Sequence, residues 1–146
     1  MRGVALGLAL GTVIAIVVSC GGAPPVNDLN EKLRKENEIT ELWTQIREFR
    51  RDAKMPLDPP RQLMIQFERS PVDQVKRVCT DGHEVPKTCD DVCDLAGAIC
   101  DNAEAICGIA ADLGKDDTFA QEKCSSAKAS CAEAKQRCCD CSGGAP

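Results

Sequence analysis

Aromatic side chains are scarce in this chain of 146 residues, and basic residues are fewer than acidic ones. It has one tryptophan, three phenylalanines and no tyrosine. A chain with so few large side chains builds a thin hydrophobic core, and small domains with thin cores usually depend on covalent cross-links. Acidic residues outnumber basic residues by 23 to 18. The net negative charge argues against the basic surface that nucleic acids require, so we expect no nucleic-acid partner.

Groups that commonly carry catalysis are also missing from the sequence. His83 is the only histidine, and a single loop histidine is more often solvated than catalytic. There is no nucleophile paired with a base, no glycine-rich phosphate loop and no Cys-x-x-Cys motif within a βαβ pattern. Six acids scatter around one predicted helix and are typical of its solvated side: Asp90, Asp91, Asp94, Asp101, Glu104 and Asp112. We therefore predict that the protein is not an enzyme and has no cofactor.

The N-terminus has the proportions of an export signal. A short positive start, Met1-Arg2, precedes an uncharged apolar run from Gly3 to Val18, which is too short for a comfortable membrane span. The run ends in Val-Val-Ser-Cys at residues 17–20, which resembles a bacterial lipobox. The resemblance implies cleavage before Cys20, a diacylglyceryl thioether on its sulfur and an acyl chain on its new amino group. The alternative is an ordinary secretory signal with a chance cysteine.

Lipidation at Cys20 predicts where the protein resides. More than one acyl chain is needed for stable anchoring, and the lipoprotein modification supplies them. Gly21, rather than an aspartate, follows the cysteine, which in enteric bacteria favours sorting to the outer membrane. We expect residues 1–19 to be a signal peptide and residues 20–27 a tether. The predicted localisation is the bacterial cell envelope, with the membrane as a partner through the lipid anchor.

The cysteines carry the most informative pattern in the chain. Of the 11 cysteines, ten remain besides Cys20, and an even number in an exported chain predicts a disulfide framework. Three lie seven residues apart before residue 115 and three lie seven apart after it, in mirror image. A seven-residue spacing keeps side chains on one face of paired helices. The mirror predicts an antiparallel hairpin with these bridges: Cys93–Cys138, Cys100–Cys131 and Cys107–Cys124.

Alanines occupy the positions between these cysteines. On the heptad that places cysteine at position a, position d is always alanine: Ala96, Ala103, Ala110, Ala127 and Ala134. Small side chains let two helices approach closely enough for disulfides, whose Cα atoms must lie about 4.4–6.8 Å apart. Four cysteines remain. The mirror places Cys89 nearest to Cys141, which leaves Cys79 with Cys139, and these two pairings are less firmly specified than the other three.

A further helix is predicted over residues 28–55, before the hairpin. Asp28 and Glu31 are spaced as a capping box. A buried stripe is predicted from the spacing of Ile39, Leu42, Ile46, Phe49 and Ala53, widened by Trp43. We expect residues 56–87 to form a proline-containing linker with a short helix around Leu63, Met64 and Phe67. Ser70 is expected to cap a second helix that has Pro71 in its first turn.

The hairpin is predicted over residues 88–141, followed by a tail at 142–146. Capping boxes are expected at Thr88 with Asp91 and at Thr118 with Gln121, and Gly114 is expected to cap the first hairpin helix. That helix has a second apolar face: Leu95, Ile99, Ile106, Ile109 and Leu113. This face should pack against the stripe at 39–53; the rival is a docking site for another protein. The outward side of the return helix is expected to carry Lys128, Glu133, Lys135, Gln136 and Arg137. The predicted fold class is all-α.

The cysteine pattern over residues 79–141 resembles small cysteine-rich lipoproteins of myxobacterial type, a resemblance that implies no activity. It is also distantly similar to twin Cys-x9-Cys hairpins, but the seven-residue step departs from theirs. Our hypothesis is a non-enzymatic envelope lipoprotein with a structural or protein-binding role, its partner not identified. The alternative is a periplasmic Cu(I)-binding protein that uses reduced thiolates, with Cys89-x3-Cys93 and Cys138-Cys139-Asp140-Cys141 as its ligands. The mirror spacing favours disulfides, so we expect no metal site.

Overall fold

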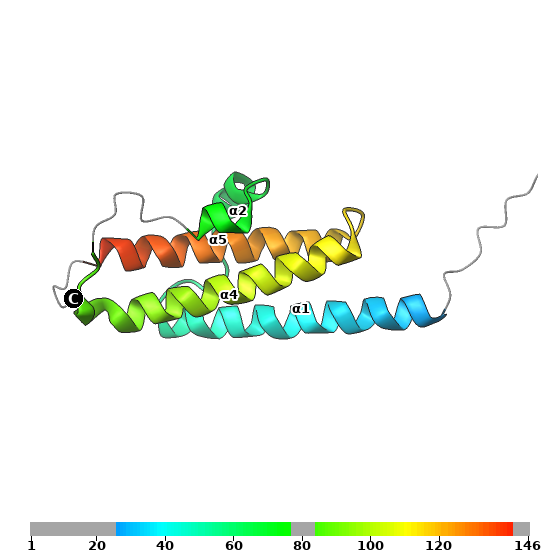
Figure 1. The fold of residues 1–146 in the computed structure, drawn as a ribbon, viewed down its shortest axis with the longest axis horizontal. Coiled ribbons are helices and arrows are strands. Elements are labelled where there is room, and N and C mark those ends of the chain that lie inside the picture. The colour runs from blue at the N-terminus through cyan, green and yellow to red at the C-terminus, as the bar shows by residue number, and fades with distance from the viewer. Residues whose placement is uncertain (1–25, 77–83, 142–146) are drawn as a thin grey trace, which may run out of the picture.

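The computed structural model describes residues 26–76 and 84–141 (Figure 1). Over these ranges the chain is helical and has no strand. The elements are α1 (Val26–Asp52), α2 (Arg61–Phe67), α3 (Val72–Val75), the 3-10 turn η1 (Lys87–Cys89), α4 (Asp90–Leu113) and α5 (Thr118–Asp140). The predicted all-α fold, with an N-terminal helix and an antiparallel hairpin, is confirmed. The predicted signal peptide and tail lie outside the described residues.

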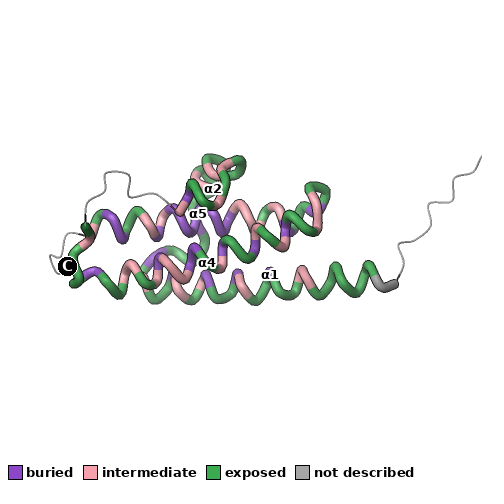
Figure 2. The backbone as a smooth tube through the Cα atoms, in the orientation of Figure 1, coloured by how far each residue is buried: buried purple, intermediate pink, exposed green. Residues whose placement is uncertain are grey.

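α1 packs against both hairpin helices and supplies much of the core (Figure 1). Ile39 and Ile46 of α1 are completely buried, as are Ile99 and Ile106 of α4. Each such side chain contributes about 1.5–3 kcal/mol when it leaves water. The second apolar face of α4 is therefore covered from within the chain. Figure 2 shows that buried positions concentrate where the three helices meet.

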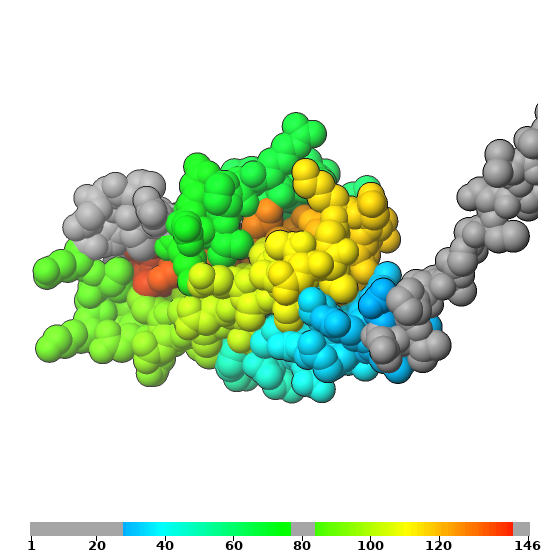
Figure 3. Space-filling model, turned by 45° about the vertical axis from the view of Figure 1, so that its right-hand side comes forward, coloured from blue at the N-terminus to red at the C-terminus, as the bar shows by residue number. Residues whose placement is uncertain are grey.

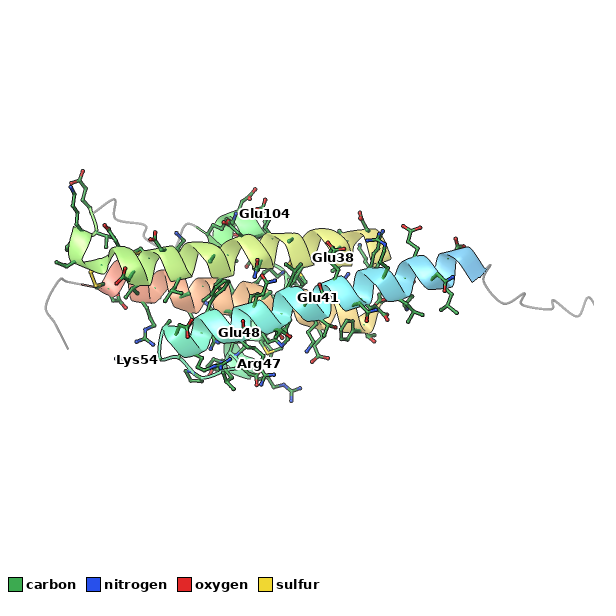
Figure 4. All side chains as sticks on the ribbon, turned by 90° about the horizontal axis from the view of Figure 1, so that it is seen from below. Glu38, Glu41, Arg47, Glu48, Lys54 and Glu104 are labelled. Carbon is green, nitrogen blue, oxygen red and sulfur yellow. A yellow bond between two sulfur atoms is a disulfide. The ribbon has the colours of Figure 1, made fainter. Side chains whose placement is uncertain are left out.

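The two ends of α1 differ in exposure. Leu29 and Leu33 in its first half are 49% and 48% exposed, as expected from the absence of a stripe there. Farther along, Glu38, Glu41 and Glu48 project from the side of α1 that faces away from the hairpin (Figure 4). This side of the helix therefore exposes carboxylates to solvent.

Lys54, rather than a proline, ends α1. Its φ of 55° is left-handed, and its N–H donates to the carbonyl of Arg51 over 2.9 Å. The N–H of Met55 donates to the carbonyl of Arg50 over 2.8 Å, and the Met55 side chain is buried. These two bonds are the Schellman arrangement, which satisfies carbonyls that a helix end otherwise leaves open. Pro56 follows the turn and cannot continue the helix.

The segment between α1 and the hairpin folds onto α5 instead of forming an open linker. α2 and α3 both contact α5 on the side away from α1 (Figure 1). Phe67 packs against the core and Val75 is 1% exposed. The expected cap by Ser70 is wrong, because Pro71 occupies the N-cap position and no side chain caps α3. Proline tolerates the start of a helix, where its missing N–H leaves no bond unmade.

Three other predicted caps need correction. Asp28 lies inside the first turn of α1, which begins at Val26. Thr88 lies within η1, Cys89 is the N-cap of α4, and no side chain caps that helix. For α5 the cap is Asp117 rather than Thr118, and its Oδ1 accepts from the Ala120 N–H over 3.0 Å. The first N–H groups of a helix can be satisfied by a 3-10 turn or by an acid one residue before the predicted cap. The spacing of the sequence alone does not distinguish these arrangements from a capping box.

The turn of the hairpin follows its prediction at Gly114. The residue has φ of 91°, and its N–H donates to the carbonyl of Ala110. Gln121 does not form a capping box with Thr118; its Nε2 donates instead to the carbonyls of Ala110 and Gly114 over 2.9 and 3.0 Å. The end of α4 is thereby tied to the first turn of α5.

Candidate functional site

A ladder of disulfides joins α4, with η1, to the α5 side of the hairpin. The bridges are Cys93–Cys138, Cys100–Cys131, Cys107–Cys124 and Cys89–Cys141. The first three have Cα separations of 4.8, 4.6 and 4.7 Å, whereas the last, at the open end of the hairpin, spans 6.1 Å. All lie within the range that a disulfide requires. These are the pairs that the mirror spacing predicts.

The alanine positions explain how the helices approach so closely. All five predicted seam alanines are buried: Ala96, Ala103, Ala110, Ala127 and Ala134. Ordinary helix pairs pack with their axes 8–10 Å apart, and larger side chains at the seam would hold them there. The small side chains therefore permit the short Cα separations of the ladder.

Several predicted site residues fall outside the described part of the chain. They are the lipidation site Cys20, the lone histidine His83 and Cys79. Cys139 is disulfide-bonded and 9% exposed. Its predicted pairing with Cys79 involves a residue that the structure does not describe.

The acidic side of α4 is solvated, as predicted. Its six acids are exposed: Asp90, Asp91, Asp94, Asp101, Glu104 and Asp112. Lys76, just after α3, forms ion pairs with Asp101 and Glu104. The hydrogen bond that Lys76 donates to Glu104 is the largest cause of its raised pKa. These pairs fasten the end of α3 to the solvated side of α4.

A buried ion pair lies where α1 meets α5. Arg50 is fully buried, although sequence reasoning assigned it no role. Its Nη2 donates to Glu133 Oε2 over 2.9 Å, and its Nε donates to the Pro56 carbonyl over 2.7 Å. A signal was present, since Arg50 follows the buried Ile46 by four residues and so continues the stripe. The arginine holds the turn after α1 against the hairpin.

The prediction that Lys128 faces outward is wrong. Only 6% of the residue is exposed, because α2 and the turn after it cover this side of α5. Its Nζ donates to the carbonyls of Glu68 over 2.5 Å and Ser70 over 3.1 Å. Burial lowers the Lys128 pKa, with a smaller opposing effect from the charge of Glu68. The ammonium thus stabilises the carbonyl end of α2, where a helix favours positive charge.

A groove of about 550 Å³ lies beside this lysine, between α2 and the first half of α5. Met64 and Ile65 line its α2 side, and Lys128 lines its α5 side. Figure 3 shows α5 in orange between the green α2 region and the yellow hairpin turn. The groove places exposed apolar surface beside a buried cation. No pattern in the sequence predicted this groove.

The described residues lack two further features. No group of three histidine, cysteine or acidic side chains there is placed to hold a metal ion. None of the described helices is both long enough and apolar enough to cross a membrane.

Comparison with protein-family models, curated proteins and solved structures found no match to this chain.

Proposed function

We propose that this protein is a non-enzymatic lipoprotein of the bacterial cell envelope with a structural or protein-binding role. In this proposal acyl chains on Cys20 anchor the protein in the outer membrane, and the helical body extends from that anchor. The lipobox-like sequence at residues 17–20 supports the anchor. The disulfide-linked helical body supports the structural or protein-binding role.

The structural or protein-binding role rests on the distribution of disulfides along the whole hairpin. Bridges lie near the turn, at the middle and at the open end. Helices cross-linked at both ends and between them cannot separate or slide without covalent change. Such bridges persist in oxidising compartments outside the cytoplasm. A body held in one shape suits a spacer or a fixed binding surface, because little conformational entropy is lost when a partner docks.

The Cu(I) alternative requires a different redox state. Copper would be bound by thiolates, but Cys89, Cys93, Cys138 and Cys141 all form disulfides in the structure. Metal storage would therefore need at least these two bridges to be reduced in the envelope. Counting free thiols in protein isolated directly from the envelope separates the two proposals. Seven or more free thiols would favour copper binding.

The anchor is tested by substituting Cys20. Wild-type protein should take up an acyl-chain label and fractionate with membranes, whereas Cys20→Ser should do neither or keep its signal uncleaved. Ser19→Ala is the matched control, because a small residue remains before the cysteine, and it should be labelled like wild type. Equal labelling of Cys20→Ser would overturn the lipoprotein proposal. Separation of inner from outer membranes then tests the sorting that Gly21 implies.

A further inference from the structure

The groove between α2 and α5 has the size of a small-ligand site. Its volume is about 550 Å³, and ligand pockets commonly enclose about 300–1,000 Å³. One face of α2 lines it, since Arg61, Met64, Ile65 and Glu68 are spaced by three and four residues. Phe67, on the other face, packs into the core and fixes the orientation of the helix.

The apolar part of the groove is left uncovered. Ile65 is 64% exposed, which is the largest exposure among the large hydrophobic side chains of the described residues. Met64, next to it in the sequence, is half-buried, and its sulfur accepts from the Ser126 hydroxyl over 3.7 Å. An apolar chain laid over these two side chains would remove their surface from water, which is favourable.

Positive charge surrounds this apolar surface. Arg61, Arg69 and Lys115 line the groove and are exposed, and the described residues place no carboxylate in an ion pair with any of them. Two acids, Glu68 and Glu122, line it as well. With Lys128 included, four cations face two carboxylates, so the groove favours an anion.

Lys128 determines where in the groove an anion should bind. Its ammonium has three N–H groups and donates two of them to backbone carbonyls. No described carboxylate forms an ion pair with it. The charge of Glu68 offsets the cost of burying this ammonium only in part, because burial has the larger effect and lowers the Lys128 pKa. An anionic group in the groove would supply further countercharge.

We propose that this groove binds a single-chain amphiphile with an anionic head, with the head beside Lys128 and Arg69 at the C-terminal end of α2 and the chain extending over Met64 and Ile65 toward Arg61. The inference goes beyond the envelope role and does not depend on lipidation of Cys20. It assigns to the α2–α5 interface a ligand class that neither the ladder nor the anchor requires.

The test uses the full chain with its disulfides formed and with Cys20→Ser, so that the protein carries no acyl chain of its own. Decanoate is titrated below its micellar concentration while the methyl signals of Met64 and Ile65 and the Lys128 ammonium are followed by NMR. We expect saturable shifts at these residues and a rise in the Lys128 pKa. Decyl phosphate, in a parallel titration, shows which anionic head is preferred.

Controls separate the head from the chain. Acetate has the charge without the chain, and decanoyl-N-methylglucamide has the chain without the charge; both should bind at least about tenfold more weakly than decanoate, because charged hydrogen bonds and apolar burial each contribute that much. Equal binding of either would overturn the proposal, as would the absence of decanoate binding.

Variants test the residues. Arg69→Ala removes an exposed cation beside the head and should weaken decanoate binding about tenfold or more without unfolding the protein. Arg51→Ala, an exposed cation on α1 away from the groove, should bind like wild type. If Arg69→Ala and Arg51→Ala have the same affinity, the assigned head site is wrong. Lys128→Met is informative only as a second variant, because it also removes the bonds to the end of α2.

Discussion

The ammonium of Lys32 on α1 lies 2.9 Å from Oδ2 of Asp117, the residue that caps α5. One carboxylate therefore caps the N-terminus of α5 and also joins this helix to α1, which is distant in the sequence. The Ala120 N–H is the largest cause of a lowered Asp117 pKa, and the hydrogen bond to Lys32 comes second. The pKa of Lys32 is raised in return, first by that same hydrogen bond.

The lowered pKa of Asp117 predicts a pH dependence of stability. Because the folded value lies below the ordinary 3.8, the contribution is complete above that value and is lost as pH falls through the folded pKa. Asp117→Asn keeps a good cap but no charge, so its deficit in unfolding free energy should shrink as pH falls. Urea unfolding of both proteins across the carboxylate titration range measures this. Asp116→Asn, next to the cap and exposed, should show no such trend.

Burial predicts the order in which the bridges are reduced. Cys100 and Cys131 are 1% and 0% exposed, whereas Cys107 and Cys124 near the turn are only half-buried. Thiol–disulfide exchange requires access of a thiolate to sulfur, so Cys107–Cys124 should be reduced before Cys100–Cys131. Graded reductant followed by alkylation and peptide mass mapping gives the order. In urea the difference should disappear; earlier reduction of the middle bridge in the folded protein would contradict the prediction.

The alanine seam predicts a contrast between two neighbouring substitutions. Ala103 is fully buried between the helices, and Ala105 is exposed on the same helix. Ala103→Leu forces extra volume where the helices are closest and should cost about 1–3 kcal/mol. Ala105→Leu should change the unfolding free energy by less than about 0.5 kcal/mol. Chemical denaturation with the disulfides intact compares them, and equal stability of the two variants would rule out the close-packed hairpin.

The Arg50–Glu133 pair predicts a loss of stability that an ordinary surface acid would not show. Glu133→Gln leaves the guanidinium buried without its carboxylate, and we expect a cost of about 1–3 kcal/mol. Glu48→Gln on the outer side of α1 (Figure 4) is the matched control and should be nearly neutral. Thermal unfolding of the two variants decides the matter. A neutral Glu133→Gln would mean that the uncharged amide satisfies the buried guanidinium as well as the carboxylate does.

Local periodicity explains why so much of the fold was predictable. The seven-residue step from Cys93 to Cys107 and its mirror depend only on which residues share a helix face, which is a short-range property. The same holds for the Ile39–Ile46 stripe and for Gly114, where backbone conformation limits the choice of residue. Such features depend on neighbouring residues in the sequence, so they can be predicted without a structure.

The sequence by itself determined the helices, the antiparallel hairpin and the bridges that lie on its seam. The burial of individual polar residues was decided only by the tertiary structure. Lys128 appears polar and outward on its own helix, and only the return of α2 across α5 buries it and forms the groove. Arg50 likewise depends on Glu133, 83 residues away. Burial and ion pairing are set by contacts between distant segments, whereas a helix face is set by its own repeat.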